Sequence, residues 1–395
     1  MTDQITDILT RGVTNTIVAD ELKAMLNSGK PLRIKLGIDP TGPKLHLGRV
    51  VVLRKLRAFQ KMGHQIVLII GDFTALVGDA SDKDSERPML TREDIEENMK
   101  HYLPQIGRVL DMENVEVRYN SEWLAPLGFY EIAKLAQKFS VAEMLDRDNF
   151  SNRYKNGKRI SLHEFLYPLM QGYDSVAVRA DIELGGNDQL FNLLAGRTLQ
   201  KGYDQKPQCV ITTELIEGTD GRKMSTSWGN AIYLEDEAND MYGKVMRITD
   251  ELIVKYFINC TEVSMEEITR MQDAMLEGAN PRDMKARLAK EIVRLYHGDA
   301  AADAAEQDFI TKFVKHETPE DIPTFTVVVD KINIVELLTD ITHFASSKSE
   351  ARRLIEGGGV SVDGTKITSH DHQVNVTDGK ILKVGKRKFG ALVRE

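Results

Sequence analysis

The sequence predicts an α/β fold in which a doubly wound parallel sheet is followed by an α-helical domain and a small α+β domain. Three observations support this prediction. Strand patterns alternate with helical patterns as far as about residue 235, convincing strand patterns are then absent to about residue 315, and the segment 331–395 holds a short helix before a glycine-led hairpin. The domains are therefore predicted at residues 1–235, 236–316 and 331–395, with a linker at 317–330.

A strand, a helix and a second strand open the predicted sheet. Apolar side chains occupy every second position of residues 32–38, as in a strand with one buried face. A helical pattern from His46 to Met62 ends at Gly63, and residues 65–71 form a nearly continuous apolar run, typical of a parallel strand covered on both faces. These segments make a βαβ unit, and similar patterns predict strands at residues 115–119, 181–184 and 208–213.

Helical patterns replace strand patterns after about residue 235. They lie at residues 251–257, 265–275 and 282–297, and they predict a helical domain. The charged segment 317–323 contains two prolines and is typical of a linker.

Composition limits the compartment and the class of protein. The N-terminus is polar and acidic and the longest strongly apolar stretch is about residues 66–70, so neither a signal peptide nor a membrane span is predicted. The two cysteines, Cys209 and Cys260, lie far apart without metal-ligand spacing, which favours a reducing compartment. We therefore expect a cytoplasmic protein with buried, unpaired cysteines.

Charge is distributed unevenly along the chain. The formal net charge of −8 argues against a general nucleic-acid coat protein. From Lys331 onward there are 11 Lys and Arg against 8 Asp and Glu, so the segment 331–395 carries +3 and the segment before it −11. A basic function is expected at the C-terminus.

Two short segments far apart in the chain predict a site for a nucleotide triphosphate. In Pro-Thr-Gly-Pro-Lys-Leu-His-Leu-Gly, ending at Gly48, a turn leads into a helix start, where free N–H groups and the helix dipole favour an anion. His46 can donate to a phosphate or ribose oxygen there, and Gly48 lets the nucleotide approach the backbone. Lys223, in Gly-Arg-Lys-Met-Ser-Thr-Ser, can neutralise charge on a reacting phosphate. Taken alone, a histidine at a helix start is more often structural, and Lys223 would be an exposed loop lysine.

Together the two segments resemble the HIGH and KMSKS signatures of class I aminoacyl-tRNA synthetases, and nearly the whole chain resembles the bacterial tyrosyl-tRNA synthetases. The resemblance implies a Rossmann-like catalytic domain, an α-helical anticodon-binding domain and a C-terminal RNA-binding domain of the type named for ribosomal small-subunit protein four. It also implies roles for Met224 and Ser225 beside Lys223 in ATP binding. The implied partners are ATP, tyrosine, tRNA(Tyr) and a second copy of the chain in a homodimer.

Specificity for the amino acid is predicted from the helix that begins near Ser161 with a Ser-Leu-His-Glu capping box. Tyr167, Gln171 and Asp174 share one stripe of this otherwise apolar helix, and polar groups are costly to bury without partners. A solvated helix face is the alternative. In the family, the matching aspartate takes the phenolic hydroxyl of tyrosine and the other two residues lie near its ammonium group. A carboxylate left unpaired by phenylalanine would disfavour that amino acid by about 1–3 kcal/mol or more.

Further site residues are implied by the resemblance alone. In the family, the residue matching Asp79 completes the ammonium site, the loop matching Gly185 to Gln189 binds the adenosine ribose and lies near the substrate carboxylate, and basic residues beyond the aspartate lie near the phosphates or the tRNA acceptor end. The residues implied are Asp39 for the adenylate, Thr41 for the phosphates, Gly186 and Asp188 for the nucleoside, Gln189 for the carboxylate, and Lys83 and Arg87 for tRNA.

Three positions depart from the family pattern. Arg49 stands where HIGH ends in histidine, and Thr226 replaces the second lysine of KMSKS. We hypothesise that Arg49 compensates for the missing lysine and count it among the catalytic residues. Lys35 stands where many relatives have a tyrosine that touches the substrate hydroxyl, so this lysine either donates to that oxygen or points elsewhere.

The C-terminal segment resembles the RNA-binding domain of the family. Lys348, Arg352 and Arg353 fall within about one and a half helical turns, opposite an apolar face, before a glycine-led hairpin. Phosphate contacts of this kind supply affinity and carry no direct sequence information. A solvated helix face is again the alternative.

The predicted function is an ATP-dependent ligase that joins tyrosine to AMP and then to its tRNA. Magnesium is expected with the ATP phosphates, and no protein-bound metal is predicted because the nine histidines show no metal-ligand spacing. A tryptophan-specific relative is one alternative, opposed by Gln171, Asp174 and the C-terminal domain. A non-catalytic RNA-binding protein on a synthetase body is another, opposed by the intact His46 and Lys223.

Overall fold

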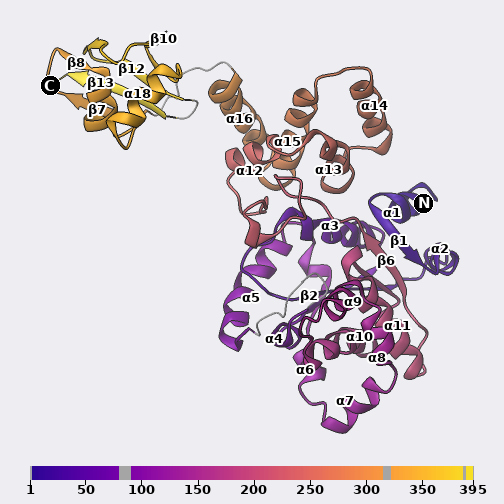
Figure 1. The fold of residues 1–395 in the computed structure, drawn as a ribbon. Coiled ribbons are helices and arrows are strands. Elements are labelled where there is room, and N and C mark those ends of the chain that lie inside the picture. Colours follow the sequence, from indigo (N-terminus) through magenta and orange to yellow (C-terminus); the bar gives the residue numbers. More distant parts are fainter. Residues whose placement is uncertain (1, 80–89, 315–321, 386–387, 395) are drawn as a thin grey trace. The chain divides into compact units, whose positions relative to one another are not determined.

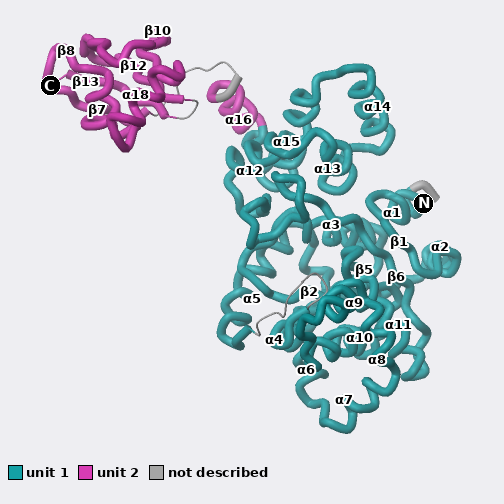
Figure 2. The backbone as a smooth tube through the Cα atoms, in the orientation of Figure 1, with its two compact units in different colours: residues 1–302 teal, residues 303–395 magenta. Residues whose placement is uncertain are grey.

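The computed structural model describes residues 2–79, 90–314, 322–385 and 388–394. Its backbone divides into two compact units, residues 1–302 and residues 303–395 (Figure 2). The first holds the large sheet and most of the helices, and the second holds the small C-terminal sheet (Figure 1). Each unit is described separately below.

A six-stranded sheet with the order β1-β6-β5-β2-β3-β4 forms the centre of the first unit. Strands β2 to β6 run parallel, and all five lie where the sequence predicts them. The edge strand β1 pairs antiparallel with β6 and is not predicted from the sequence. The strands span β1 (Val13–Ile17), β2 (Arg33–Ile38), β3 (Gln65–Ile70), β4 (Val115–Tyr119), β5 (Ile182–Gly186) and β6 (Cys209–Thr213).

The helix after β2 begins and ends where the sequence indicates. His46 is its N-cap, and Gly63 follows its end with φ +84°, a left-handed conformation that favours glycine. The helices of this part are α1 (Thr2–Thr10), α2 (Ala19–Asn27), α3 (Leu47–Lys61), α4 (Thr74–Val77), α5 (Arg92–Ile106), α6 (Ser121–Leu124), α7 (Phe129–Ala136), α8 (Val141–Leu145), α9 (Asp148–Lys155), α10 (Leu166–Val178) and α11 (Leu190–Gly202).

Helix α10 is held close to α11 by a glycine. A Cβ atom added at Gly172 would lie 3.0 Å from the Ala195 backbone and 3.0 Å from a methyl group of Leu199. Any larger residue would push the two helices apart. The predicted capping box at Ser161 and Glu164 is present and starts the short 3₁₀ turn Leu162–Phe165 that precedes α10. Turn and glycine together fix the helix that carries the predicted tyrosine-binding stripe.

Helices alone follow the sheet within the rest of the first unit, as the sequence predicts. They are α12 (Ala238–Met246), α13 (Ile253–Cys260), α14 (Met265–Leu276), α15 (Pro281–His297) and α16 (Asp299–Phe309), the last of which crosses into the second unit. Short 3₁₀ and π turns lie at Met112–Asn114, Asn187–Gln189, Thr226–Trp228, Asp250–Leu252, Ile310–Val314 and Leu337–Ile341.

The second unit is a small α+β domain. Its five-stranded sheet has the order β10-β9-β12-β13-β7, and β11 pairs with β8 beside it. Strand β7 lies inside the segment 317–330 that the sequence predicts as a linker, but it pairs with β13 and so belongs to the sheet. The elements are β7 (Thr324–Val327), β8 (Lys331–Asn333), α17 (Ile334–Glu336), α18 (Lys348–Glu356), β9 (Val360–Val362), β10 (Thr365–Lys366), β11 (Gln373–Asn375), β12 (Lys380–Val384) and β13 (Lys388–Arg394).

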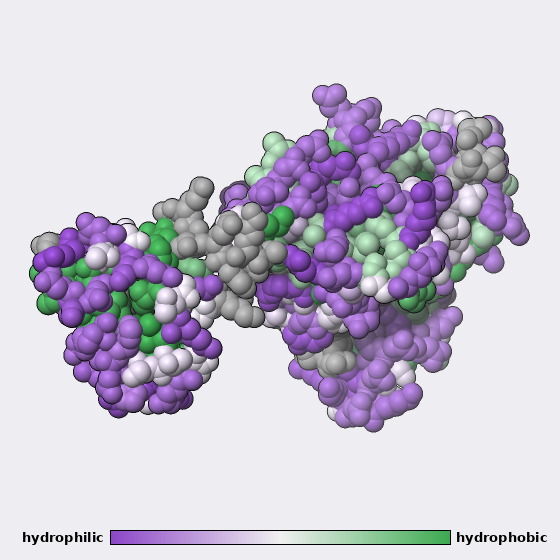
Figure 3. Space-filling model, turned by 90° about the horizontal axis from the view of Figure 1, so that it is seen from above, coloured by the Kyte–Doolittle hydropathy of each residue, from purple (hydrophilic) through white to green (hydrophobic). Residues whose placement is uncertain are grey.

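The face of the protein seen in Figure 3 is mostly hydrophilic on both units, with small hydrophobic areas between the polar ones. No helix within the described ranges is long and apolar enough to cross a membrane.

Candidate active site

A cavity of about 560 Å³ opens at the carboxyl ends of β2, β3 and β5, where ligands of doubly wound sheets bind. The N-terminus of α3, one face of α10 and the loop before α12 complete its walls. The cavity brings together most of the residues predicted from the sequence: Asp39, Thr41, His46, Gly48, Arg49, Asp79, Tyr167, Gln171, Asp174, Gly186, Asp188, Gln189, Lys223, Met224 and Ser225.

Asp174 lies at the deep end of this cavity with 2% of its surface exposed. Its carboxylate accepts hydrogen bonds from Trp123 Nε1 at 2.8 Å and from Asn120 Nδ2 at 3.4 Å. Burial raises the pKa of Asp174 to about 7, although the nearby Lys35 charge opposes the shift. This burial excludes the solvated helix face considered above, and it leaves a carboxyl group that gains from a further O–H donor.

A chain of hydrogen bonds joins Asp174 to the turn after β2. Asn120 donates to the Thr74 hydroxyl at 2.9 Å, and Thr74 donates to Asp39 Oδ1 at 2.7 Å. Tyr167 donates its phenolic hydrogen to Asp39 Oδ2 at 2.8 Å, and burial raises the pKa of this tyrosine. Gly71 leaves room for Asp39, because a Cβ there would lie 2.0 Å from its carboxylate.

Asp79 is held at the rim of the same pocket. Gln189 Nε2 donates to Asp79 Oδ2 at 2.8 Å, and an Arg147 guanidinium nitrogen lies 3.9 Å from Asp79 Oδ1. The guanidinium of Arg147 also lies over the rings of Phe150 and Phe191, at 5.0 and 4.9 Å from their centroids. The two groups that the family resemblance assigns to the ammonium and carboxylate of the substrate thus touch each other.

Lys35 does not line the cavity. Its ammonium group is fully buried beneath α10, 2.8 Å from Glu183 Oε1, and it donates to the Ser175 hydroxyl at 2.8 Å and the Gln171 carbonyl at 3.0 Å. Of the two possibilities left open by the sequence, these contacts favour the second, in which Lys35 points elsewhere. Through the ion pair with Glu183 and these hydrogen bonds, Lys35 links β5 of the sheet to α10.

His46 is a neutral imidazole at the start of α3. Burial, helped by the charges of Arg49 and Lys223, lowers the pKa of His46 to about 3. Its Nδ1 atom is buried and has no hydrogen-bond partner among the described residues. A Cβ at Gly48 would lie 3.0 Å from this ring nitrogen, a tight contact that a larger residue could make only by shifting the imidazole. The histidine can therefore donate or accept a hydrogen bond but contributes no positive charge near neutral pH.

The two signature segments contact each other directly. The Gly48 N–H points to the Met224 sulfur at 3.4 Å. Backbone bonds from Leu47 N–H to the Ile232 carbonyl, at 2.8 Å, and from Leu234 N–H to the Leu45 carbonyl, at 3.0 Å, fasten the chain beyond Met224 to the start of α3. Segments that are far apart in the sequence thus form one wall of the cavity.

Lys223 forms an ion pair with Asp188 in this structure, with 2.9 Å between Nζ and Oδ2. Asp188 stands after β5 next to Gly186, where a Cβ would lie 2.7 Å from the aspartate oxygen. The loop holding Lys223 is fixed from below by the buried Asn230, which accepts from Ser225 N–H and donates to Asp220.

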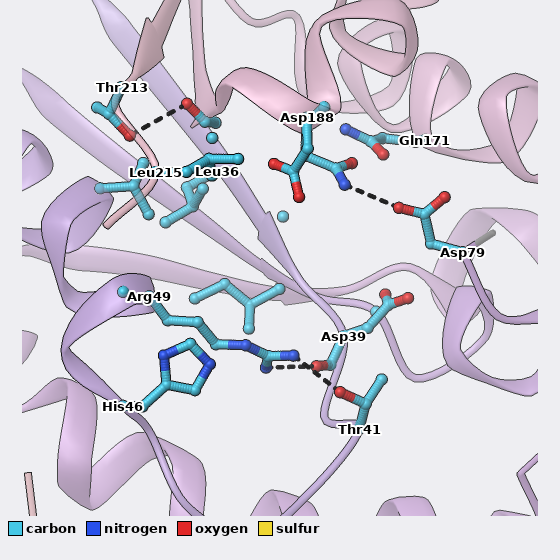
Figure 4. Close-up of a pocket in the computed structure, with 18 of the residues that line it drawn as sticks. Leu36, Asp39, Thr41, His46, Arg49, Asp79, Gln171, Asp188, Thr213 and Leu215 are labelled. Atoms are coloured by element: carbon cyan, nitrogen blue, oxygen red, sulfur yellow. Dashed lines mark hydrogen bonds between the residues drawn. The ribbon is translucent and has the colours of Figure 1, made fainter. Parts of the chain in front are cut away.

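Arg49 forms hydrogen bonds with the turn after β2 (Figure 4). It donates to the Thr41 hydroxyl at 2.8 Å, to the Asp39 carbonyl at 3.3 Å and to the Tyr102 hydroxyl. Thr226 also lines the cavity. The guanidinium of Arg49 is thus engaged with protein groups that position Asp39 and Thr41.

Three of the residues predicted to bind tRNA lie on helix α18 of the second unit. Lys348, Arg352 and Arg353 are exposed on α18, while Ala351 and Ile355 of the same helix are fully buried. The predicted helix, its two faces and the hairpin after it are all present. Lys83 and Arg87 lie outside the described residues.

Four side chains of the site escape sequence reasoning: Trp123, Asn120, Arg147 and Tyr102. Each contacts a predicted residue but belongs to no motif. The end of β4 was a usable signal for Asn120, since polar residues at the carboxyl end of a parallel strand face the ligand edge. No such signal marks Arg147 or Tyr102.

Comparisons with known sequences identify the family of the chain. Residues 27–314 match the family described as tRNA synthetases class I (W and Y), and residues 314–392 match the tyrosine–tRNA ligase SYY-like C-terminal domain. The tyrosine–tRNA ligase of Thermotoga maritima is 50% identical over 97% of this chain and 95% of its own length. That of Moorella thermoacetica is 46% identical over 98% and 94%.

Solved structures share the fold. A truncated mitochondrial tyrosyl-tRNA synthetase of Aspergillus nidulans matches 78% of this chain and 94% of its own, with TM-score 0.64 and 24% identity. Tyrosyl-tRNA synthetase complexed with L-tyrosine from Archaeoglobus fulgidus matches 77% and 99%, with TM-score 0.62 and 20% identity. From the family matches and the full-length relatives, the chain belongs to the tyrosine–tRNA ligases, within the class I tRNA synthetases.

Proposed function

We propose that the cavity binds tyrosine and ATP side by side, joins them to tyrosyl-adenylate with release of pyrophosphate, and then passes the tyrosyl group to the terminal adenosine of tRNA(Tyr). The observation that carries this proposal is the buried Asp174, which has two hydrogen-bond donors and a raised pKa at the closed end of a pocket. The phenolic hydroxyl of tyrosine supplies the third donor. Phenylalanine would leave the carboxyl group short of a partner.

The rest of the tyrosine fits the polar groups nearer the rim. We assign its ammonium group to Asp79, Tyr167 and Gln171, and its carboxylate to the neighbourhood of Gln189. The bond between Gln189 and Asp79 holds both groups in place before the substrate arrives, which lowers the cost of ordering them.

ATP would lie between the start of α3 and the Lys223 loop. We assign the ribose to Asp188 and Gly186, the adenylate phosphate to the turn at Asp39 and Thr41, and the leaving phosphates to His46, Gly48 and Lys223. Magnesium is expected to accompany those phosphates as part of the substrate. No protein nucleophile is needed, because alignment of the carboxylate and stabilisation of developing charge supply the rate.

Lys223 must exchange partners for this mechanism to operate. It pairs with Asp188 at 2.9 Å, so ribose binding at that aspartate would release the ammonium group toward the phosphates. Nucleotide binding and arrival of the catalytic charge are then coupled in one event.

Tyrosine-dependent exchange of pyrophosphate into ATP, run over a panel of amino acids, tests the proposal. Tyrosine should support exchange, and phenylalanine and tryptophan should not. Lys223→Ala should slow exchange by at least about a hundredfold, while the thermal midpoint stays within a degree or two. Exchange driven by tryptophan, or none with any amino acid, would refute the assignment.

We propose further that the protein acts as a homodimer in the cytoplasm. The segment 129–162 exposes five large hydrophobic side chains to solvent. Exposed apolar surface of this extent is typical of a protein–protein interface and unusual on a monomer. The residues are Phe129, Tyr130, Val141, Tyr154 and Leu162. Phe129→Asp with Leu162→Asp should give a monomer in analytical ultracentrifugation. Leu276→Asp, at a residue equally exposed on α14, should leave a dimer. The two unpaired, buried cysteines suit a reducing compartment.

A further inference from the structure

A second cavity, of about 450 Å³, lies at the other end of α3, away from the active site. Helix α3 packs against α1 and α13, and α13 packs against α15 (Figure 1). All four helices contribute to the cavity wall. The two cavities use different faces of α3: Gly48, Arg49 and Val52 line the first, and the second is lined by Val51, Arg54, Lys55, Arg57, Ala58 and Lys61.

This cavity is strongly basic in a protein whose net charge is −8. Its wall carries two carboxylates, Asp7 and Glu262, against six cations: Arg11, Arg54, Lys55, Arg57, Lys61 and Arg108. Concentrating like charges in a concave, partly dehydrated site costs free energy unless an anion balances them. The cavity therefore has an excess of four positive charges, which the negative charges of a short phosphate chain would balance.

Three of the cations have structural duties. Arg11 donates to the carbonyls of Phe257, Ile258 and Thr261 at the end of α13, at 2.8 to 3.2 Å. Lys55 donates to carbonyls at the end of α1, and Arg108 donates to the carbonyls of Leu234 and Tyr296. These hydrogen bonds satisfy backbone carbonyl groups, most of them at helix ends where no partner exists within the helix. The three side chains therefore have a structural role.

Arg54 and Arg57 have no such duty. Arg57 donates to the side chain of its own neighbour on α3, Gln60, and no carboxylate within the described ranges forms an ion pair with either arginine. Burial lowers the pKa of Lys55 to about 8; the Asp7 charge opposes this shift, and the Arg11 charge adds to it. The two arginines therefore add charge that the fold does not use.

A tyrosine hydroxyl lies beside one of these two arginines. Tyr296 lines the cavity, and its buried phenolic oxygen interacts with the Arg54 side chain. Burial raises the pKa of Tyr296 to about 12 despite the nearby Arg54 charge, so the group remains an O–H donor.

We propose that this cavity is a second anion site that binds the di- or triphosphate chain of a small molecule, with Arg54 and Arg57 as its principal contacts. Guanidinium groups match phosphate oxygens in pairs, and apolar residues such as Val51, Ala58 and Leu295 lie beside them to receive an attached organic group. The site is independent of the proposed reaction, and it is formed by helices that meet around a recess rather than by an open strip that an RNA backbone would follow.

Calorimetric titration of the full-length protein with inorganic tripolyphosphate tests the site, in magnesium-free buffer of low ionic strength. The active site is first filled with a non-hydrolysable tyrosyl-adenylate analogue, and the titration is repeated with Lys223→Ala, because the analogue leaves open the positions proposed for the leaving phosphates. Binding at the second site should be the same in both titrations. We expect one tripolyphosphate per chain. Arg54→Gln with Arg57→Gln should weaken binding at least about tenfold, while the matched pair Lys23→Gln with Lys30→Gln, at two exposed lysines of the N-terminal region, should not.

The outcomes separate the possible sources of the phosphate group. Equal binding of ATP and tripolyphosphate assigns free polyphosphate, and tighter binding of ATP assigns a nucleotide. No binding with the active site filled, or undiminished binding to the arginine variant, overturns the proposal. It is also overturned if the variant loses affinity for tRNA and keeps its affinity for tripolyphosphate. Arg57→Gln alone serves if the double variant unfolds early.

Discussion

At the scale of single residues, Asp174 joins recognition to stability. Burial raises its pKa from the ordinary 3.8 to about 7, whereas Trp123 and Asn120 donate hydrogen bonds that stabilise its charged form. Desolvation therefore outweighs these two hydrogen bonds. The carboxyl group is costly to ionise until a third donor arrives, which makes binding of a phenol favourable.

The stability of the protein should consequently depend on the ionisation of Asp174. Because the folded protein binds this proton more tightly than the unfolded chain does, the contribution of Asp174 to stability falls as pH rises from about 4 to about 7. Urea unfolding of the parent and of Asp174→Asn over that range should show the parent losing up to about 4 kcal/mol relative to the variant. Parallel curves would mean that Asp174 is already ionised at low pH.

Lys35 shows how a departure from the family pattern is accommodated. It forms a fully buried ion pair with Glu183, which also accepts a hydrogen bond from Ser175 at 3.0 Å. Lys35→Met would leave Glu183 charged and buried, so we expect a loss of about 3–5 kcal/mol in urea unfolding. Adding Glu183→Gln should restore part of it. Lys100→Met removes an exposed pair with Glu97 and should leave the free energy of unfolding almost unchanged.

At the scale of elements, Arg49 acts on the turn between β2 and α3. Its three hydrogen-bonding partners, Asp39, Thr41 and Tyr102, are all protein groups, so its contacts do not favour the idea that it directly replaces the lysine missing at Thr226. Arg49→His and Thr226→Lys should then change the adenylation kcat additively in free energy. Clear coupling would restore the compensation hypothesis. Tyr102→Phe should mimic part of the Arg49→His loss if the turn is what Arg49 controls.

The elements predicted from the sequence are those whose burial is visible in their own residues. Strand β3 is apolar at nearly every position and buried at five of six, and α3 has clear signals at both ends. Strand β1, Val-Thr-Asn-Thr-Ile, has no fully buried residue and exists because its backbone pairs with β6, the last strand of the sheet in chain order. Such pairing leaves little trace in local sequence.

The residues of the candidate site also divide into those with a local sequence signal and those placed by tertiary contacts. Residues inside a signature or on one stripe of a helix could be placed from spacing, because the helix or loop carries them together. Arg147 reaches Asp79 only through tertiary packing, and Lys35 finds Glu183 on a strand far along the chain. A charged residue within a buried strand indicates that a partner must exist, because an unpaired buried charge is costly, but the sequence does not indicate which residue that partner is.

At the scale of the whole molecule, the catalytic cavity and the exposed cations of α18 belong to different units. Activation belongs to the acidic first unit, whereas the exposed cations of α18 stand on a domain with its own core of buried residues such as Leu337, Ile355 and Leu382. The domain can therefore lose surface charge without affecting the catalytic cavity.

Neutralising Lys348, Arg352 and Arg353 to glutamine should accordingly raise KM for tRNA about tenfold and leave pyrophosphate exchange unchanged. Each lost phosphate contact should also lower the slope of log affinity against log salt by about one. Glutamine at Lys23, Lys30 and Lys331, three exposed lysines elsewhere, removes the same charge and should change neither quantity as much. If both triple variants behave alike, net charge and not α18 attracts the tRNA; if neither changes KM, the basic face of α18 is only solvated surface.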